Sequence, residues 1–196
     1  MLAEAYPDLE PRFVEEQTQH LITRLRNGNL DLAIMALPSE ATGMVDSPLY
    51  TEKFSIVCPP DHPIAGREDV ELAALKDLDL LLLDDGHCLR DQVVDLCRHA
   101  NINPAEATNS VTRASSLTTI MQLVMGGLGC TLVPESALAT ECHGKDVAIA
   151  HFASGVTAER EVGLVFRSSA ARAEEFREFG TLITSAYNKA IERSRQ

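Results

Sequence analysis

The sequence predicts an α/β fold, and three observations indicate it. Short apolar runs, such as LDLLLL at 78–83, are typical of strands buried on both faces. Amphipathic stretches with helical spacing lie between these runs. Turn-forming residues stand at the junctions, for example Asn27-Gly28 and Asp84-Asp85-Gly86. With 196 residues, of which 45% are hydrophobic and 23% charged, the chain can bury a core of ordinary size.

Each element follows from its local pattern and from the residues that end it. In order, we expect an opening helix that ends at Asn27-Gly28, a strand at 30–37, a loop at 38–47, a strand at 51–58 that ends at Pro59-Pro60, a short helix in VELAALKD, a strand in LDLLLL, a helix from Cys88 to about Ala100, a strand at 110–113, a helix at 116–125, a strand at 130–133, an irregular stretch, a strand in EVGLVF, and a last helix at about 171–191. Such alternation favours a parallel sheet with helices on its faces.

The charge of the chain excludes some function classes. A net charge of -12 repels phosphate backbones, so this chain alone is not expected to bind DNA. No stretch has the roughly 20 apolar residues of a membrane span, and the acidic start MLAEAYPDLE differs from a signal peptide. We therefore expect a cytoplasmic protein without a membrane partner.

Cys88 stands directly after a turn, at the expected start of a helix. Unpaired backbone amides and the helix dipole favour an anion there, and the thiolate is the form of cysteine that reacts with peroxides. His87 and Arg90 are close enough in sequence to strengthen this effect. Three carboxylates nearby oppose it: Asp84, Asp85 and Asp91. The alternative is that Cys88 is a small apolar residue at a helix start.

Cys97 follows nine residues after Cys88. In a continuous helix that spacing gives about 13.5 Å of rise and puts the two side chains on opposite faces. A disulfide needs Cα atoms within about 7 Å, so the two sulfurs are able to bond only if the helix opens.

The remaining motifs favour structural roles. The cysteines and histidines lack zinc-ligand spacing, so no metal site is expected. Gly126-Gly127-Leu128-Gly129 follows a helix and precedes a strand, which indicates a helix end rather than a phosphate-binding loop. Asp84 and Asp85 are read as a solvated turn. The other three cysteines are expected to be inert core residues, Cys58 and Cys130, and an exposed loop thiol, Cys142.

Two segments resemble the effector-binding domain of LysR-type transcriptional regulators: YPDLEPRFVEEQTQHLITRLRNGNLDLAIMALP and SSLTTIMQLVMGGLGCTLVP. Within that family, DDGHCLRDQ followed by Cys97 resembles the peroxide-sensing members. The resemblance implies that Cys88 reacts with peroxide and that Cys97 resolves the product into a disulfide. It also implies that Thr18, Gly86 and His87 shape the peroxide pocket and that Arg160 lies near the reactive sulfur. We expect Arg90 to lie in the same pocket. Alternatively, Thr18 is a helix-start cap and Arg160 a surface charge on a strand.

The family fold implies two Rossmann-like lobes, like those of periplasmic binding proteins. Residues 1–50 with 158–196 form lobe I, and residues 51–157 form lobe II with the redox cysteines. The crossovers are expected near Thr51 to Phe54 and near Thr157 to Val162. Family members begin with a winged helix-turn-helix, which we do not find in this sequence, and the family's first strand is expected to precede Met1.

The function implied is that of a regulatory domain, not an enzyme. Formation of the disulfide would refold the segment between Cys88 and Cys97, and this would alter subunit association and DNA binding of the full-length activator. The implied partners are hydrogen peroxide, further copies of the chain as a homodimer or a full-length tetramer, DNA through the N-terminal domain only, RNA polymerase, and a glutaredoxin- or thioredoxin-type reductant. No cofactor is implied. The alternatives are a domain that binds a small metabolite between its lobes and, from a different class, a thiol peroxidase.

Overall fold

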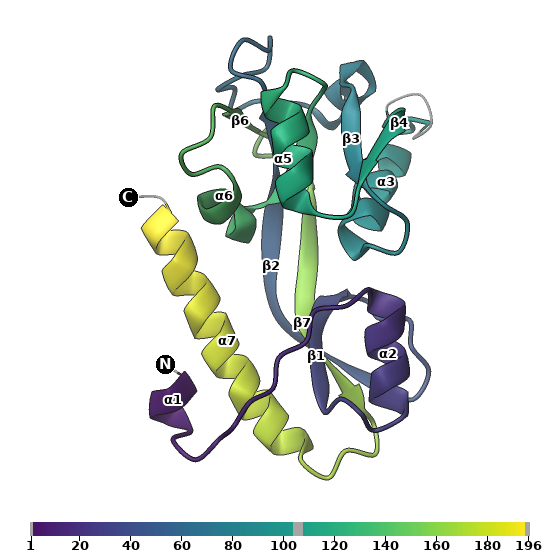
Figure 1. Ribbon diagram of the computed structural model, residues 1–196, viewed down its shortest axis with the longest axis vertical. Coiled ribbons are helices and arrows are strands. Elements are labelled where there is room, and N and C mark those ends of the chain that lie inside the picture. Colours follow the sequence, from purple (N-terminus) through teal and green to yellow (C-terminus); the bar gives the residue numbers. More distant parts are fainter. Residues whose placement is uncertain (1, 104–107, 195–196) are drawn as a thin grey trace. The chain divides into compact units, whose positions relative to one another are not determined.

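The computed structural model describes residues 2–103 and 108–194 (Figure 1). In chain order the helices and strands are α1 (Leu2–Ala5), α2 (Thr18–Arg26), β1 (Leu32–Leu37), β2 (Met44–Cys58), the 3-10 helix η1 (Leu72–Asp77), β3 (Leu80–Leu83), α3 (Cys88–His99), β4 (Thr108–Ala114), α5 (Leu117–Met125), β5 (Thr131–Pro134), α6 (Glu135–Glu141), β6 (Ala148–His151), β7 (Glu159–Arg167) and α7 (Ala173–Ser194). The chain forms two compact units, unit 1 of residues 1–51 with 161–196 and unit 2 of residues 52–160. Strands β2 and β7 each pass from one unit into the other.

Unit 1 is a small sheet with a helix on each face. Strand β1 pairs antiparallel with β7, from Leu32 opposite Phe166 to Leu37 opposite Glu161. Because alternate residues of a strand point to opposite faces, the sheet buries two separate clusters. One cluster joins β1 to α2 and includes Ile22, Leu25, Ala33 and Met35. The other joins β7 to α7 and includes Leu164, Phe166 and Phe176.

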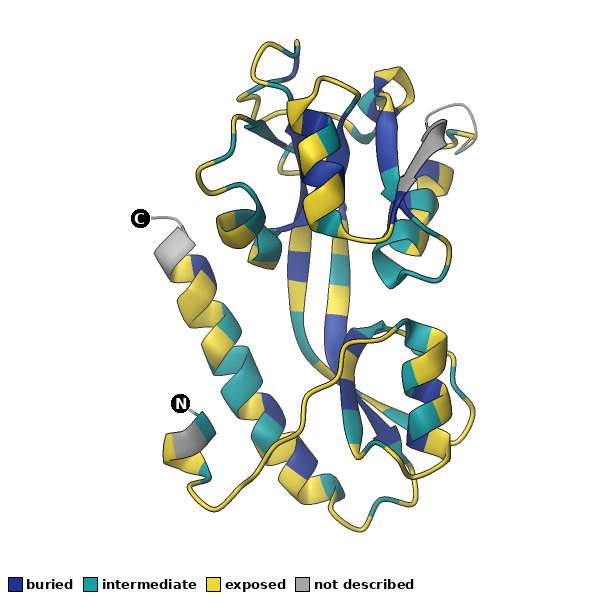
Figure 2. Cartoon of the chain, in the orientation of Figure 1, coloured by how far each residue is buried: buried dark blue, intermediate teal, exposed yellow. Residues whose placement is uncertain are grey.

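Unit 2 repeats this arrangement around the second half of β2. Strand β2 pairs antiparallel with β5 on one side and with β6 on the other. Strand β3 pairs parallel with β4, and Leu80 forms a parallel bridge with Cys130. One face of this sheet packs against α3 and η1. The other face packs against α5, whose turns alternate between buried and exposed residues (Figure 2).

The end of α5 depends on glycine. Gly126 follows the helix, and Gly127 adopts a positive φ of +75°. A Cβ atom on Gly129, whose φ is +148°, would lie 2.2 Å from the backbone oxygen of Asp79. The segment at 126–129 is thus a helix end with close packing, as the sequence predicts.

Several boundaries and pairings differ from expectation. Strand β1 pairs antiparallel with β7, and β2 pairs antiparallel with β5 and β6, where the alternating pattern favoured parallel pairing. An apolar run indicates that a strand is buried but not the direction of its partner. Strand β2 begins at Met44, inside the expected loop 38–47. The opening helix is two helices, α1 and α2, with no helix at 6–17. The expected irregular stretch contains α6 and β6.

Within the described part of the chain, no helix is both long enough and apolar enough to cross a membrane.

Candidate functional site

A tight turn carries the chain from β3 into α3. Gly86 has a φ of +93°, a conformation that glycine adopts at little cost, and the Asp84 amide donates to the carbonyl oxygen of Ala114. His87 is the N-cap residue in extended conformation, and Cys88 is the first residue of the helix. The predicted start of α3 is confirmed. The Cys88 side chain is half-buried.

The charge of Arg90 is compensated by carboxylates. Its guanidinium lies 2.8 Å from an oxygen of Asp85 and 3.5 Å from one of Asp91. Because these contacts hold the cation against two anions, Arg90 adds little net positive charge to the start of α3. Its role in a peroxide pocket stays a prediction.

Cys97 lies in the last turns of the same helix and is fully buried. It packs in one core cluster with Val93 and Leu96 of α3 and with Leu75 and Leu80 from η1 and β3. Each of the five cysteines is a free thiol. Because α3 is continuous from Cys88 to His99, the two thiols are separated by about 13.5 Å of helical rise.

The other cysteines lie in protected positions. Cys58 and Cys130 have exposed fractions of 0% and 1%, so their predicted burial is confirmed. Burial raises the pKa of the Cys58 and Cys97 thiols, and it raises the pKa of Cys130 to about 12. Cys142 was expected to be exposed but is half-buried after α6, where burial also raises its pKa.

Arg160 contacts the helix that carries Cys88. Its Nη1 atom donates to Oε1 of Gln92 at 3.3 Å. Gln92 follows Cys88 by four residues in α3, and residues so spaced are neighbours on one helix face, with Cβ atoms about 5–6 Å apart. The Arg160 side chain is 18% exposed, so it is not the surface charge of the alternative reading.

Glu52 holds the other side of the Arg160 guanidinium. Its Oε1 accepts from Nε at 2.7 Å and lies 2.6 Å from Nη2, and its Oε2 accepts from the Ser136 amide at 3.1 Å. Glu52 was not among the site residues predicted from the sequence. The sequence does contain a sign of its burial. Alternate residues of a strand share one face, and Glu52 alternates with Phe54, Ile56 and Cys58, which all point into the core.

Thr18 is the first residue of α2 in unit 1. The N-cap residue is Gln17, so Thr18 does not occupy the capping position that the alternative assigned to it. Its place in a peroxide pocket stays a prediction.

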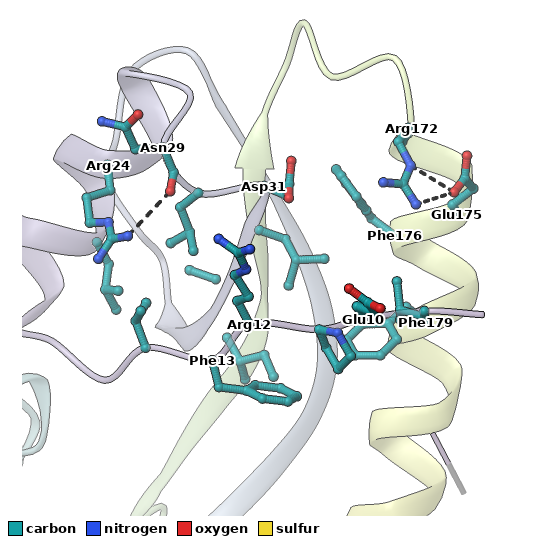
Figure 3. A pocket seen from close by; sticks show the side chains of 18 of the residues that line it. Glu10, Arg12, Phe13, Arg24, Asn29, Asp31, Arg172, Glu175, Phe176 and Phe179 are labelled. Atoms are coloured by element: carbon teal, nitrogen blue, oxygen red, sulfur yellow. Dashed lines mark hydrogen bonds and ion pairs between the residues drawn. The ribbon is translucent and has the colours of Figure 1, made fainter. Parts of the chain in front are cut away.

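A cavity of about 630 Å³ lies within unit 1 (Figure 3). Its lining comes from the segment 6–14, α2, residues 29–31, β1 and the chain around the start of α7. The lining is mainly apolar with several charged side chains, of which Arg172 and Glu175 form an ion pair at 2.7 Å. Phe13 projects from the extended segment and is 78% exposed. None of the residues that line this cavity is a cysteine. Among the described residues, no three His, Cys, Asp or Glu side chains are grouped to hold a metal ion.

Comparison with known proteins identifies close relatives. The LysR substrate binding domain family matches residues 1–187. A probable hydrogen peroxide-inducible genes activator of Mycobacterium avium is 48% identical over 182 residues, which are 93% of this chain and 57% of the relative. A cysteine-to-serine mutant of Corynebacterium glutamicum OxyR with bound hydrogen peroxide is 59% identical, with a TM-score of 0.94 over 97% of this chain and 59% of that one. The oxidised form of that OxyR is also 59% identical, with a TM-score of 0.86 over 99% of this chain and 60% of that one.

These matches confirm the fold class and the resemblance drawn from the sequence. The chain spans 57% of the length of the Mycobacterium avium relative and 59% and 60% of the two OxyR chains.

Proposed function

Because this chain belongs to the LysR substrate binding domain family, among its OxyR members, we propose that it is the hydrogen peroxide-sensing regulatory domain of a transcription activator. The observation that carries the proposal is the position of two thiols in helix α3. One half-buried thiol, Cys88, begins the helix four residues before Gln92, which Arg160 contacts, and a second thiol, Cys97, lies buried near the end of the helix.

The first chemical step is oxidation of Cys88. Its thiolate attacks one oxygen of hydrogen peroxide, an S–O bond forms and the O–O bond breaks, and the second oxygen leaves as hydroxide and takes up a proton to become water. Cys88 becomes a sulfenic acid. A hydrogen-bond donor that faces the leaving oxygen stabilises the charge that develops on it, and Arg160 is the donor we assign to this role.

The second step forms the disulfide. The Cys97 sulfur attacks the Cys88 sulfur, the S–O bond breaks and water leaves, so that two thiols and one peroxide give one disulfide and two waters. Since α3 holds these sulfurs apart, this step needs the helix to open between them. Val93 and Leu96 then leave their present core contacts.

The output of the switch is a change in association. Apolar residues released from α3 need new partners, and a rearranged contact between subunits supplies them. In the full-length protein this change would reposition the DNA-binding domains and alter contact with RNA polymerase. A glutaredoxin- or thioredoxin-type dithiol would restore the reduced form. A regulator of this kind acts on the chromosome, which places the proposed activity in the cytoplasm.

The test is a mass measurement after one equivalent of hydrogen peroxide. We expect the intact protein to lose two hydrogens and peptide mapping to join Cys88 to Cys97. Cys97→Ser should stop at an added oxygen on Cys88, and Cys142→Ser, the matched control, should behave like the unsubstituted protein. A disulfide that excludes Cys88 would refute the proposal. Sustained peroxide consumption with a reductant would instead indicate a thiol peroxidase.

The cavity in unit 1 favours a second candidate function. Its volume of about 630 Å³ and its apolar lining with a few charged groups are typical of small-molecule sites. A metabolite bound there would raise the melting temperature in proportion to the logarithm of its concentration, and Cys88→Ser would not change that shift.

A further inference from the structure

We propose that Glu52 is a positioning residue for the peroxide reaction, because it fixes the orientation in which Arg160 faces the start of α3. This inference rests on the proposed function, in which Cys88 is the reacting thiol.

The first support is the burial of Glu52. Its side chain has no exposed area, and a carboxylate taken out of water is costly unless its oxygens are paired. Both oxygens have partners, Arg160 for Oε1 and the Ser136 amide for Oε2. The carboxylate therefore has one arrangement in which its hydrogen-bonding capacity is used, and that arrangement determines where the guanidinium lies.

The second support is the division of the guanidinium between two acceptors. Nε and Nη2 face Glu52, while Nη1 reaches Gln92 on α3. The ring of Phe54 lies beneath the guanidinium, with 5.9 Å from its centroid to Cζ. Three of the five N–H groups thus have partners among the described residues, and two remain for an oxygen of peroxide or of the Cys88 sulfenic acid.

The third support is electrostatic. Glu52 and Arg160 form a close ion pair, so the net charge near α3 is small and Arg160 acts as a directed donor rather than as a bare cation. A directed donor stabilises the leaving oxygen of peroxide but does little for a reaction whose leaving group needs no hydrogen bond. The two kinds of reaction at Cys88 should therefore respond differently when Glu52 is changed.

A purely structural role is the competing explanation. Glu52 and Arg160 are the first and last residues of unit 2, on β2 and β7, so their ion pair joins strands that are 108 residues apart in sequence. If that were the whole role, loss of the carboxylate would loosen the unit and change every reaction of Cys88 together.

The experiment compares peroxide with iodoacetamide, whose iodide leaves without a proton. We expect Glu52→Gln to lower the second-order rate constant of Cys88 oxidation at least about tenfold while the alkylation rate stays within about twofold. The control is Glu159→Gln, which removes an exposed carboxylate next to Arg160 in sequence and should change neither rate. Equal loss of both rates, or no loss of either, would overturn the inference.

A double-mutant cycle tests the route of the effect. In an Arg160→Met background, Glu52→Gln should cause no further loss of peroxide reactivity, since Glu52 acts through Arg160. Additive losses would refute this. Circular dichroism melts identify any variant that fails to fold. If Glu52→Gln fails to fold, the comparison becomes Glu52→Asp with Glu52→Ala, and the aspartate variant, which keeps the carboxylate, should retain more peroxide reactivity. If the fast reaction with peroxide persists in Cys88→Ser, the proposed function is wrong. If that reaction requires Cys88 but its rate is unchanged in Glu52→Gln, only this inference is wrong.

Discussion

Cys88 and Cys97 lie in one unbroken helix, with one half-buried thiol at its start and one fully buried thiol near its end. The helical rise between them, about 13.5 Å, is nearly twice the Cα separation that a disulfide tolerates. Joining them breaks several helical hydrogen bonds, each worth about 1 kcal/mol net, and removes Cys97 from its apolar cluster. The proposed disulfide would therefore be coupled to unfolding of this segment.

Hydrogen exchange should report that coupling. Peroxide treatment should reduce the protection of the peptide spanning residues 86–100, because amides paired within α3 become open to solvent. In Cys97→Ser, peroxide should oxidise Cys88 without forming the bridge, so protection of this peptide should change much less. Unchanged protection in a protein whose disulfide is proven by mass would contradict the coupling.

The elements around the thiols were predictable because their signals are local. The run LDLLLL, the turn with Gly86 and the helix from Cys88 each follow from residues adjacent in sequence, and the structure contains all three. Strand direction was not predictable in the same way. The antiparallel partner of β1 is β7, more than 120 residues away in sequence. An apolar strand does not indicate whether its partner runs parallel or antiparallel to it.

The ion-pair partner of Arg160 was missed for a related reason. Glu52 stands in the polar stretch TEK, where a carboxylate is ordinarily solvated. Its burial depends on Arg160, which lies 108 residues later. The only sign in the sequence that the Glu52 side chain is buried was its alternation with Phe54, Ile56 and Cys58.

Arg90 and Arg160 should differ in their importance for the peroxide reaction. Arg160→Met should slow oxidation of Cys88 by about one hundredfold, the usual cost of losing a donor to a developing oxyanion. Arg90→Met should change the rate by less than about threefold, because Asp85 and Asp91 already compensate its charge. Stopped-flow measurement of the second-order rate constant decides between them, and a larger effect at Arg90 would exchange the two assignments.

Gly129 should tolerate substitution much less than a glycine in open space. Gly129→Ala places Cβ 2.2 Å from the Asp79 backbone oxygen, so backbone must move, and we expect a loss of more than about 3 kcal/mol in the free energy of unfolding. Gly144→Ala is the matched control, since its φ of +68° costs about 1–2 kcal/mol but no atom obstructs the added Cβ. Urea denaturation measures both, and equal losses would mean that the contact with Asp79 relaxes freely.

Alkaline pH should weaken the fold through Cys130. Burial raises the pKa of this thiol from 9.0 to about 12, so above pH 9 the unfolded chain releases a proton that the folded chain keeps. The free energy of unfolding should then fall by about 1.4 kcal/mol per pH unit from this group, and its full contribution should be present only below pH 9. Urea denaturation under reducing conditions, between about pH 8 and pH 11, measures the slope.

The comparison variant for this titration is Cys130→Ala, which lacks the thiol and creates a small cavity. The cavity lowers stability by a constant amount at every pH, so the variant starts less stable than the unsubstituted protein. Above pH 9 its stability should fall less steeply, because the remaining titrating groups, including Cys58 and Cys97 with raised pKa values, are common to both proteins. The difference in the free energy of unfolding between the unsubstituted protein and Cys130→Ala should therefore become smaller as the pH rises. Two parallel curves would show that Cys130 ionises as readily in the folded chain as in the unfolded one, and that solvent reaches the cluster in which Cys97 is buried.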